Sequence, residues 1–569
     1  MTPEEFLNSF GMLAEAPEGI NRVRELVLEL ATRGMLVPQS ADDEAAAIAL
    51  RKRHETRRYL WKERHGTKPF PSSPSIPVAE LPSLPPGWAW EKIEYLGQDP
   101  FAAVQTGPFG SQLLKTEFVS TGVPVIAVGN IGYLSFKNDG RFFITAKKAE
   151  ALSRYNIQAG DLLFARTGSV GKVCVAPDYV AGWRMTGHIL RLRLDTTVAN
   201  PRFIAFTLRG SASVQQQVSE GIKGTTRPGF NTSLLERVIV PIPPLAEQKR
   251  IVAKVDQLMA LCDELEARQT KQRETGARLT QSALEALTSA EGPEEFDRAW
   301  QRVADNFEVL FTTPKSIGEL RKSVLGLALH GRLVHQDASE EDASTLLERI
   351  AQGHLQPSQR SDAATADEET RHPLPVTWTW ASVGSIATCM LGKMLDKSKH
   401  TRGTPRPYLR NINVRWSSFD LSDLLSMYFE DDELERYGVR AGDVLICEGG
   451  EPGRAAVWRD SSKTMLIQKA IHRARLEGGI VPEWLVMNLR YDAWTGQLAQ
   501  HFTGATIKHF TGQALARYQI RLAPLAEQKR IIAKVDQLLA LCDTLESKLR
   551  DAEQGAQRLA EAMVAEMVA

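Results

Sequence analysis

The chain has 569 residues, of which 43% are hydrophobic and 24% are charged, a composition typical of a globular protein with three or four domains. Lysine plus arginine (69) equals aspartate plus glutamate (69), so the zero net charge excludes a basic tail but not a local DNA-binding patch. The five cysteines form no CxxC pair, which argues against a structural zinc site; without a signal-peptide pattern or an apolar run of about 18 residues, we expect a cytoplasmic protein.

The chain is an internal duplication. The segment PLAEQKRIVAKVDQLMALCDELE at residues 244–266 recurs at residues 524–546 with 20 of its 23 positions identical. Weaker matches surround this pair in the same chain order, such as LPPGWAW with LPVTWTW and the Ala-Gly-Asp tripeptides at residues 159–161 and 441–443. Each half is therefore predicted to contain a short helix, a globular module and a long helix.

Residues 1–68 are predicted to form an N-terminal helical region. Apolar residues recur at helical spacing over residues 20–35, and Gly34 stands where a helix would stop. The next stretch, RKRHETRRYLWKERHGTK, carries eight lysines and arginines against two glutamates, so it could contact phosphates. A solvated or partner-facing helix face is the commoner outcome for such a charge run. Prolines at short intervals then predict a linker over residues 69–83.

Residues 84–243 and 372–523 are predicted to form two α+β modules with curved β-sheets. Short runs such as VPVIAV, DLLFA and ILRLRL are rich in β-branched residues and are bounded by glycine, proline and asparagine. Helical patches such as PRFIAFTLRG and PEWLVMNLRY interrupt these runs.

Both modules contain polar loops rich in glycine, lysine, arginine or asparagine. In the first module they are QTGPFGS, ARTGSVGK and KGTTR; in the second they are GKMLDKSK, YLRNINV, EGGEPGR, QKAIHR and TGATIKH. Their amides, hydroxyls and cations suit phosphates and base edges. The competing interpretation is that the glycines only make turns and the side chains only face solvent.

Two long helices are predicted at residues 244–290 and 524–569. Apolar residues step by four and three along both, the spacing of a coiled-coil core, and the core positions are Ile251, Val255, Leu258, Cys262, Leu265, Ile531, Val535, Leu538, Cys542 and Leu545. Two matched stripes most simply pack on each other, and an antiparallel arrangement would place the modules far apart about a pseudo-twofold axis. A central helical region at residues 291–355 and an acidic linker at residues 356–371 separate the halves.

No pattern of catalytic residues appears in the sequence. The 11 histidines include no HExxH, ARTGSVGK lacks the GxxxxGK[ST] spacing, and neither NPP[FYW] nor DPP[FYW] of the amino-methyltransferases occurs. We therefore expect that this chain is not an enzyme and that it binds no metal or cofactor itself.

Two modules, each followed by a long helix that begins PLAEQKRIVAKVDQL, resemble the specificity subunit of type I restriction-modification systems. The resemblance extends to LALHGRLVHQ, to AWQRVADNFEVLFTTPKSIGELRKSVL, and to the TGPFGS, EGGEPGR and TGATIKHFT loops. It implies that each module is a target recognition domain for one half of an asymmetric, bipartite DNA site, and that an antiparallel coiled coil sets the gap. It also implies two adenine methyltransferase subunits, which bind S-adenosylmethionine, and two motor/nuclease subunits, which use ATP and Mg.

The resemblance further implies which residues meet double-stranded DNA. In the first module they are Thr106, Gly107, Ser111, Arg166, Thr167, Ser169, Lys172, Lys223, Thr225 and Arg227. In the second they are Lys393, Arg410, Asn411, Asn413, Glu448, Arg454, Gln468, Lys469, His472, Thr506, Lys508 and His509. Two alternatives remain open. A methyltransferase or nuclease acting alone would lack its motifs, and a coiled-coil scaffold that binds only protein would leave the duplicated polar loops without a role.

Overall fold

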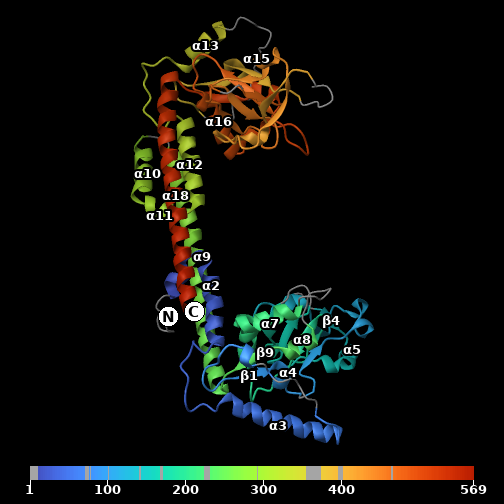
Figure 1. The fold of residues 1–569 in the computed structure, drawn as a ribbon. Helices are drawn as coiled ribbons and strands as arrows, with labels where there is room; N and C mark the ends of the chain where they lie inside the picture. Colours follow the sequence, from blue (N-terminus) through green and yellow to red (C-terminus); the bar gives the residue numbers. More distant parts are fainter. Residues whose placement is uncertain are drawn as a thin grey trace. The chain divides into compact units, whose positions relative to one another are not determined.

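The computed structural model describes residues 10–70, 76, 78–99, 101–139, 142–166, 171–222, 231–290, 293–353, 373–394, 402–462 and 465–568. The chain divides into two compact units, Met1–Lys271 with Glu553–Ala569 and Gln272–Ala552. Each unit joins one β-rich module to a set of helices (Figure 1). The expected α+β class, with two modules and two long helices, is confirmed. The linker predicted at residues 356–371 lies outside the described residues.

In the first unit, helices lie on both sides of the module in the sequence. α2 (Gly19–Thr32) turns Val23, Val27 and Ala31 toward the core. The chain leaves this helix through Gly34, whose φ is +72° and at which a Cβ would lie 2.7 Å from the ring of Pro85. The predicted helix stop is therefore also a close contact that only glycine permits. The basic stretch forms α3 (Ala46–His65), and the module is followed by α9 (Leu245–Ser289).

The first module is built on a four-stranded antiparallel sheet with the order β2-β8-β5-β6, whose strands are β2 (Val104–Thr106), β8 (Ile189–Leu192), β5 (Leu162–Ala165) and β6 (Val173–Val175). A second sheet has the order β4-β3-β7, with β4 (Phe142–Ile144), β3 (Val123–Ile126) and β7 (Arg184–Met185). β1 (Ala89–Lys92) pairs with β9 (Ile239–Ile242), which brings the two ends of the module together where α9 begins. Shorter helices are α4 (Ile93–Leu96), α5 (Ala146–Ala151), α7 (Ala212–Ile222) and α8 (Thr232–Arg237).

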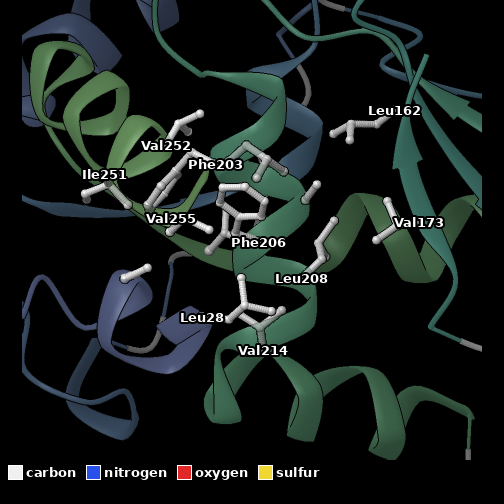
Figure 2. Packing of buried hydrophobic residues seen from close by; sticks show 14 of the residues in the cluster. Leu28, Leu162, Val173, Phe203, Phe206, Leu208, Val214, Ile251, Val252 and Val255 are labelled. Atoms are coloured by element: carbon white, nitrogen blue, oxygen red, sulfur yellow. The ribbon is translucent and has the colours of Figure 1, made fainter. Parts of the chain in front are cut away.

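One helix, α6 (Pro201–Gly210), connects this sheet with the long helix. Asn200 caps it by accepting hydrogen bonds from the amides of Arg202 and Phe203. Figure 2 shows α6 between Leu162 and Val173 of the sheet and Ile251 and Val255 of α9, all in one buried cluster. A large apolar side chain contributes about 1.5–3 kcal/mol when fully buried. The module and the first half of α9 therefore share a core and form one rigid body.

The helices of the second unit repeat this plan. They are α10 (Pro293–Asp305), α11 (Phe307–Leu310), α12 (Pro314–Leu329), α13 (Ala343–Gly353) and the first part of α18 (Leu525–Val568). Thr313 caps α12 through its hydroxyl, and Pro314 occupies the first turn, where its missing amide costs nothing.

The second module is also built on an antiparallel sheet, ordered β11-β20-β17-β18, with β11 (Ala387–Leu391), β20 (Ile471–Leu476), β17 (Val444–Cys447) and β18 (Ala455–Val457). Its other sheet is β15-β12-β19-β16, from β15 (Leu425–Phe429), β12 (Thr404–Leu409), β19 (Met465–Ile467) and β16 (Gly438–Val439). β10 (Thr379–Ser382) pairs with β21 (Gln519–Leu522) at the two ends of the module. β13 (Val414–Arg415) and β14 (Ser418–Phe419) form a short hairpin. The helices of the module are α14 (Val383–Ile386), α15 (Glu433–Tyr437), α16 (Pro482–Trp494) and α17 (Gly512–Arg517).

Equivalent polar contacts join the module and the helices within each unit. Trp88 Nε1 donates to Glu247 at 3.1 Å, and Trp378 Nε1 donates to Glu527 at 3.0 Å. Three other pairs match in the same way: Arg250–Asp43 with Arg530–Glu340, Arg24–Glu266 with Arg321–Glu546, and Gln248–Pro243 with Gln528–Ala523. The repeated PLAEQKR segment is thus the place where module and helix are joined.

The two long helices run in opposite directions. In the first unit, Ala560 and Met563 near the end of α18 pack on the cluster that contains the first half of α9 together with α2 and α6. In the second unit, Leu284 and Leu287 near the end of α9 pack with Cys542 near the middle of α18. The expected antiparallel packing is therefore confirmed.

The matched stripes differ from the expectation in what they contact. Ile251, Val255, Leu258 and Cys262 are buried against α2 and α6 of their own unit, with Leu265 partly buried beside them. Ile531, Val535, Cys542 and the partly buried Leu538 and Leu545 pack in the second unit against α12, α16 and the last turns of α9. Each stripe packs within its own unit, so the stripe is repeated together with the module.

Candidate nucleic-acid interface

Polar loops of the first module gather at one end of the β2-β8-β5-β6 sheet. Thr106 closes β2 opposite Leu190, and Ala165 closes β5 opposite Ile189, so the segments that begin at Thr106 and at Arg166 leave the sheet at the same end. Lys172 lies opposite Ala165, the neighbour of Arg166, since the Ala165 amide donates to the Lys172 carbonyl at 3.2 Å. Thr106, Ser111, Arg166 and Lys172 all remain at least partly exposed.

Gly107 has a structural reason to be glycine. A Cβ at this position would lie 2.1 Å from the carbonyl oxygen of Thr186, so no other residue fits without moving the backbone. Its amide donates to Ile189 at 3.1 Å, which ties the loop to β8. Gly107 therefore shapes the loop that presents Ser111.

Two exposed aromatic residues at this end were missed by the sequence interpretation. Phe109, 51% exposed, lies under the guanidinium of Arg166 at 4.8 Å. Tyr133, 55% exposed, has Lys172 Nζ at 5.8 Å and the Arg209 guanidinium at 5.0 Å from its ring centre. An aromatic residue inside the glycine-rich QTGPFGS loop was the available signal for Phe109. The approach of Arg209 to Tyr133 depends on tertiary structure and has no local signal.

The second module presents its polar loops at the equivalent end of its sheet. β11 ends at Leu391 opposite His472, β17 ends at Cys447 opposite Ile471, and β18 begins next to Ile446. Residues 448–454 leave from this edge. The hairpin of residues 503–509 joins them, because the Phe510 amide donates to the Glu448 carbonyl at 2.8 Å.

The side chains of this module that face outward are shared among three loops. Lys469, Thr506, Lys508 and His509 are exposed, and Glu448 and Gln468 are half-buried. His509 closes the 503–509 hairpin, in which its amide and that of Thr503 each donate to the other residue's carbonyl oxygen at 2.9 Å. This group combines donors, cations and one carboxylate, as contacts to bases and phosphates require.

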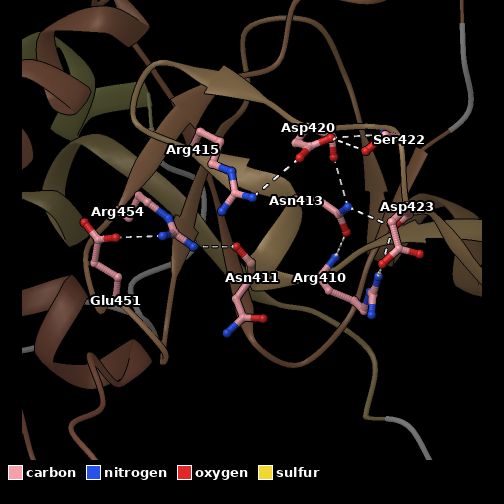
Figure 3. Close-up of polar contacts among 9 residues, drawn as sticks. All are labelled: Arg410, Asn411, Asn413, Arg415, Asp420, Ser422, Asp423, Glu451 and Arg454. Atoms are coloured by element: carbon pink, nitrogen blue, oxygen red, sulfur yellow. Dashed lines mark hydrogen bonds and ion pairs between the residues drawn. The ribbon is translucent and has the colours of Figure 1, made fainter. Parts of the chain in front are cut away.

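Several predicted contact residues are held by internal partners instead (Figure 3). Arg410 Nη2 donates to the Asp423 carboxylate at 2.7 Å, and Arg454 Nη1 donates to Glu451 at 2.6 Å. Arg454 Nη2 also donates to the Asn411 carbonyl at 2.8 Å, while the Asn411 side chain donates to the carbonyl of Gly449. Arg410 and Arg454 thus join the 408–414 loop to its neighbours.

The side chain of Asn413 is buried, and both of its polar atoms have hydrogen-bond partners. Its Oδ1 accepts from the Arg410 amide at 2.9 Å, and its Nδ2 donates to the carbonyls of Asp420 and Asp423, each at 3.0 Å. Asn130 makes the same three kinds of contact in the first module, with Ala127, Lys137 and Asp139. The repeated asparagine is a loop-forming residue.

Lys393 and His472 are also buried. Lys393 Nζ donates to the Tyr428 carbonyl at 3.0 Å and pairs with Glu433, beside the ring of Phe429. His472 Nε2 lies 2.9 Å from the Phe510 carbonyl oxygen, and burial lowers the pKa of its imidazole, so the ring is neutral at physiological pH. Thr167, Ser169, Lys223, Thr225 and Arg227 lie outside the described residues.

The described part of the chain contains no cluster of three or more histidine, cysteine, aspartate or glutamate side chains that could hold a metal ion. None of its helices has the length and apolar character needed to cross a bilayer. Burial raises the pKa of the Cys174 thiol to about 12 and that of the Cys447 thiol to about 11, so both are poor nucleophiles.

Comparisons with known proteins agree on one family. The model of the type I restriction modification DNA specificity domain matches residues 110–274. The EcoAI and EcoEI specificity subunits of Escherichia coli are each 27% identical to this chain, over 573 and 577 residues, and each alignment covers 96% of this chain and 93% of the relative. The EcoKI specificity subunit of Escherichia coli K12 is 21% identical over 369 residues, or 64% of each protein.

Solved structures are similar over most of their length. A chain from a structure on complex assembly and conformational transition of the type I R-M system is 19% identical with a TM-score of 0.45, and the match covers 85% of this chain and 98% of that one. The HsdS subunit from Thermoanaerobacter tengcongensis is 20% identical with a TM-score of 0.44, covering 84% and 98%. The two full-length sequence alignments include both modules and both long helices. Residues 110–274 thus match the DNA specificity domain of type I restriction modification, and along 96% of its length the chain is similar to type I restriction enzyme specificity subunits.

Proposed function

We propose that each module binds one half of an asymmetric, two-part DNA site, and that the long helices carry the catalytic subunits of the complex. Specificity subunits are the non-catalytic components of type I restriction-modification complexes. The observation that carries the proposal is that two modules of the same architecture expose different side chains at the same end of equivalent sheets. Two modules with the same fold but different exposed side chains suit the recognition of two different base sequences.

The polar residues of each interface divide into two roles. In the second module, Glu448, Gln468, Lys469, Thr506, Lys508 and His509 are assigned to contacts with DNA because their side chains reach the surface. Lys393, Arg410, Asn411, Asn413, Arg454 and His472 are assigned to positioning those loops, since their polar atoms have internal partners. In the first module, Thr106, Ser111, Arg166 and Lys172 are assigned to contact and Gly107 to loop shape. Thr167, Ser169, Lys223, Thr225 and Arg227 remain contact candidates.

A repeated surface on the long helices suits repeated partners. Outside the core stripe, the two copies expose the same residue at most equivalent positions, including Lys249 with Lys529, Gln257 with Gln537, and Leu261 with Leu541. Leu261 is 39% exposed and Leu541 is 55% exposed. Two identical surfaces on one chain would bind two copies of one partner. We assign this partner as the adenine methyltransferase subunit, with two motor/nuclease subunits joining the complex; the methyltransferase would bind S-adenosylmethionine, and the motor/nuclease would use ATP and Mg.

The proposal is tested by mapping methylated adenines across the host genome with and without this gene. Deletion should abolish methylation at one motif made of two parts and a fixed gap. Complementation with Lys508→Ala and His509→Ala combined should relax bases in one part of that motif, while Arg166→Ala should relax bases in the other. A base-reading contact is worth about 1–3 kcal/mol, so each relaxation should be visible as partial methylation of altered sites.

Lys548→Ala, which removes an exposed cation from α18 away from the loops, should leave the motif unchanged. An unchanged methylation map after deletion would remove the specificity role. Relaxation of both parts by the second-module variant alone would contradict the assignment of one module to each half-site.

A further inference from the structure

The basic helix α3 is fastened rigidly to the first module by its buried side. The guanidinium of Arg53 donates to the carbonyls of Gly97 and Gln98 and pairs with Asp195. Arg57 donates to the Glu94 carbonyl at 2.7 Å and lies 4.5 Å from the ring centre of Tyr95. Figure 1 shows α3 along the edge of the module, beside α4. These contacts use only two of the eight cations of the segment.

The opposite side of α3 presents an unpaired basic stripe. Arg51, Arg58 and Lys62 are separated by seven and four residues, so they lie on one face of the helix. All three are exposed, and none forms an ion pair or hydrogen bond with the described residues. Glu55 is the acidic residue of this stripe, and Lys68 continues the positive charge beyond the end of the helix.

The equivalent helix of the second unit lacks this stripe. The first residues of α13 and α3 occupy equivalent positions in the two units. The Ala46 amide donates to the Gly87 carbonyl in the first unit, and the Ala343 amide donates to the Thr377 carbonyl in the second. α13 has 11 residues against 20 for α3, and its single arginine, Arg349, pairs with Glu341 at 3.2 Å. Within the described residues, which stop at Gly353 in α13, the basic extension is therefore found in the first unit alone.

The far end of α3 lies close to the loops assigned to DNA. Trp61 packs against Phe101 at 5.3 Å, and the Arg64 guanidinium lies 5.4 Å from the same ring. Phe101 stands three residues before β2, whose other end is Thr106. At about 3.3 Å per strand residue, this end of the helix is within about 17 Å of the Thr106–Ser111 loop along the chain.

We propose that the Arg51–Arg58–Lys62 face of α3 binds the phosphate backbone of duplex DNA that flanks the half-site bound by the first module. The inference rests on the proposed function, because it takes DNA to be bound at the neighbouring loops. The stripe spans about 16 Å of helix, and duplex DNA carries about nine phosphates over that length of its axis. The contact is independent of base sequence and strengthens binding on one side of the recognition site.

The test compares the wild-type chain with an Arg51→Gln, Arg58→Gln, Lys62→Gln triple variant, each assembled with its methyltransferase subunits. Binding to a fluorescein-labelled 40-base-pair duplex of random sequence is measured by anisotropy between about 50 and 250 mM salt. Each phosphate contact contributes about −0.9 to the slope of log K against log salt. The triple variant should therefore lose one to about three units of slope and bind at least about tenfold more weakly at 100 mM salt.

Two single changes sharpen the comparison. Glu55→Gln removes the acidic residue of the stripe and should strengthen binding. Arg349→Gln on α13 is the matched control for Arg58→Gln and should leave both affinity and slope unchanged. Retention of the wild-type helix content in the triple variant, measured by circular dichroism, separates a lost contact from a lost helix.

The outcomes separate this inference from the proposed function. Wild-type binding with an identical slope in the triple variant would overturn the α3 contact while leaving the modules as DNA readers. Loss of subunit assembly in the triple variant, with DNA affinity unchanged, would overturn it in favour of an acidic protein partner. If the assembled wild-type chain failed to bind any duplex, the proposed function would fall as well.

Discussion

At the residue scale, His472 couples the second module to pH. Its ring is buried beneath the 503–509 hairpin, where Nε2 hydrogen-bonds to the Phe510 carbonyl oxygen. Burial lowers its pKa in the folded protein, so the unfolded chain binds a proton at higher pH than the folded chain does. The stabilisation is complete above the unfolded pKa of about 6.5 and is lost as the pH falls below it. We expect hydrogen exchange of peptides covering β20, corrected for the intrinsic pH dependence of amide exchange, to speed up between pH 7.5 and 5.5.

His472→Gln keeps a donor for Phe510 but cannot take a proton, so it should remove most of that acceleration when both proteins are compared at the same pH. The difference should be at most about 1.4 kcal/mol per pH unit. His501, whose pKa burial also lowers, is present in both proteins and cancels in the comparison. Equal acceleration in wild type and variant would show that His472 is not the group that titrates.

The interface residues show how far a sequence can be interpreted at this scale. QTGPFGS and EGGEPGR were predicted as loops where β2 and β17 end, because glycines and polar residues mark strand ends directly. The ion pair between Arg410 and Asp423 was not predictable from the sequence. The two residues are 13 positions apart and come together only because Asn413 forms the turn between them. The Arg454–Glu451 pair had a local signal in EGGEPGR, since the two charges are three residues apart.

At the scale of elements, equivalent charges behave differently where each module meets its long helix. Asp256 of α9 is paired with Arg202 of α6 in the first unit. Its counterpart Asp536 of α18 meets Glu483 of α16, and burial together with Glu483 raises the pKa of Asp536. The ionised carboxylate of Asp536 therefore opposes folding at neutral pH, a cost that is absent below the unfolded pKa and appears as the pH rises.

Asp256→Asn and Asp536→Asn should consequently change the melting temperature in opposite directions at pH 7. The first variant loses an exposed ion pair and should melt lower, whereas the second loses a repulsion and should melt higher. Both groups are substantially exposed, so each effect should stay within about 1 kcal/mol. The increase for Asp536→Asn should shrink toward pH 3.5, where the carboxyl group of Asp536 takes up a proton. A drop in melting temperature for both variants would contradict the contrast.

The long helices show a similar limit on sequence interpretation. Their length and apolar spacing follow from the heptad pattern, which is local. What the stripes contact does not follow, because α6 and α16 supply apolar faces that the pattern of α9 and α18 cannot reveal. Phe203 and Phe206 of α6 take the place that an opposing helix would fill in a simple coiled coil.

At the scale of the whole molecule, duplication separates what is held constant from what varies. The repeated residues Glu247 and Gln248 of the first copy contact their own module, and Arg250 pairs with Asp43 of the same unit; their counterparts in the second copy do the equivalent. Other repeated residues, such as Leu261 and Leu541, are exposed instead. A surface that is the same in both copies while the loops differ suits a partner that must bind regardless of the DNA sequence read.

The number of methyltransferase subunits tests this arrangement. Leu261 and Leu541 are exposed leucines at equivalent positions of the repeated surface, so replacing one by lysine should block one partner and leave the other. Native mass spectrometry should find two methyltransferase subunits on the wild-type chain, one on Leu261→Lys, one on Leu541→Lys and none on the double variant. Exposed Lys548→Leu serves as a control for a change of charge on α18 and should keep two. Loss of both subunits from either single variant would mean that the two partners bind as one cooperative unit, and two subunits on the double variant would place the docking surface elsewhere.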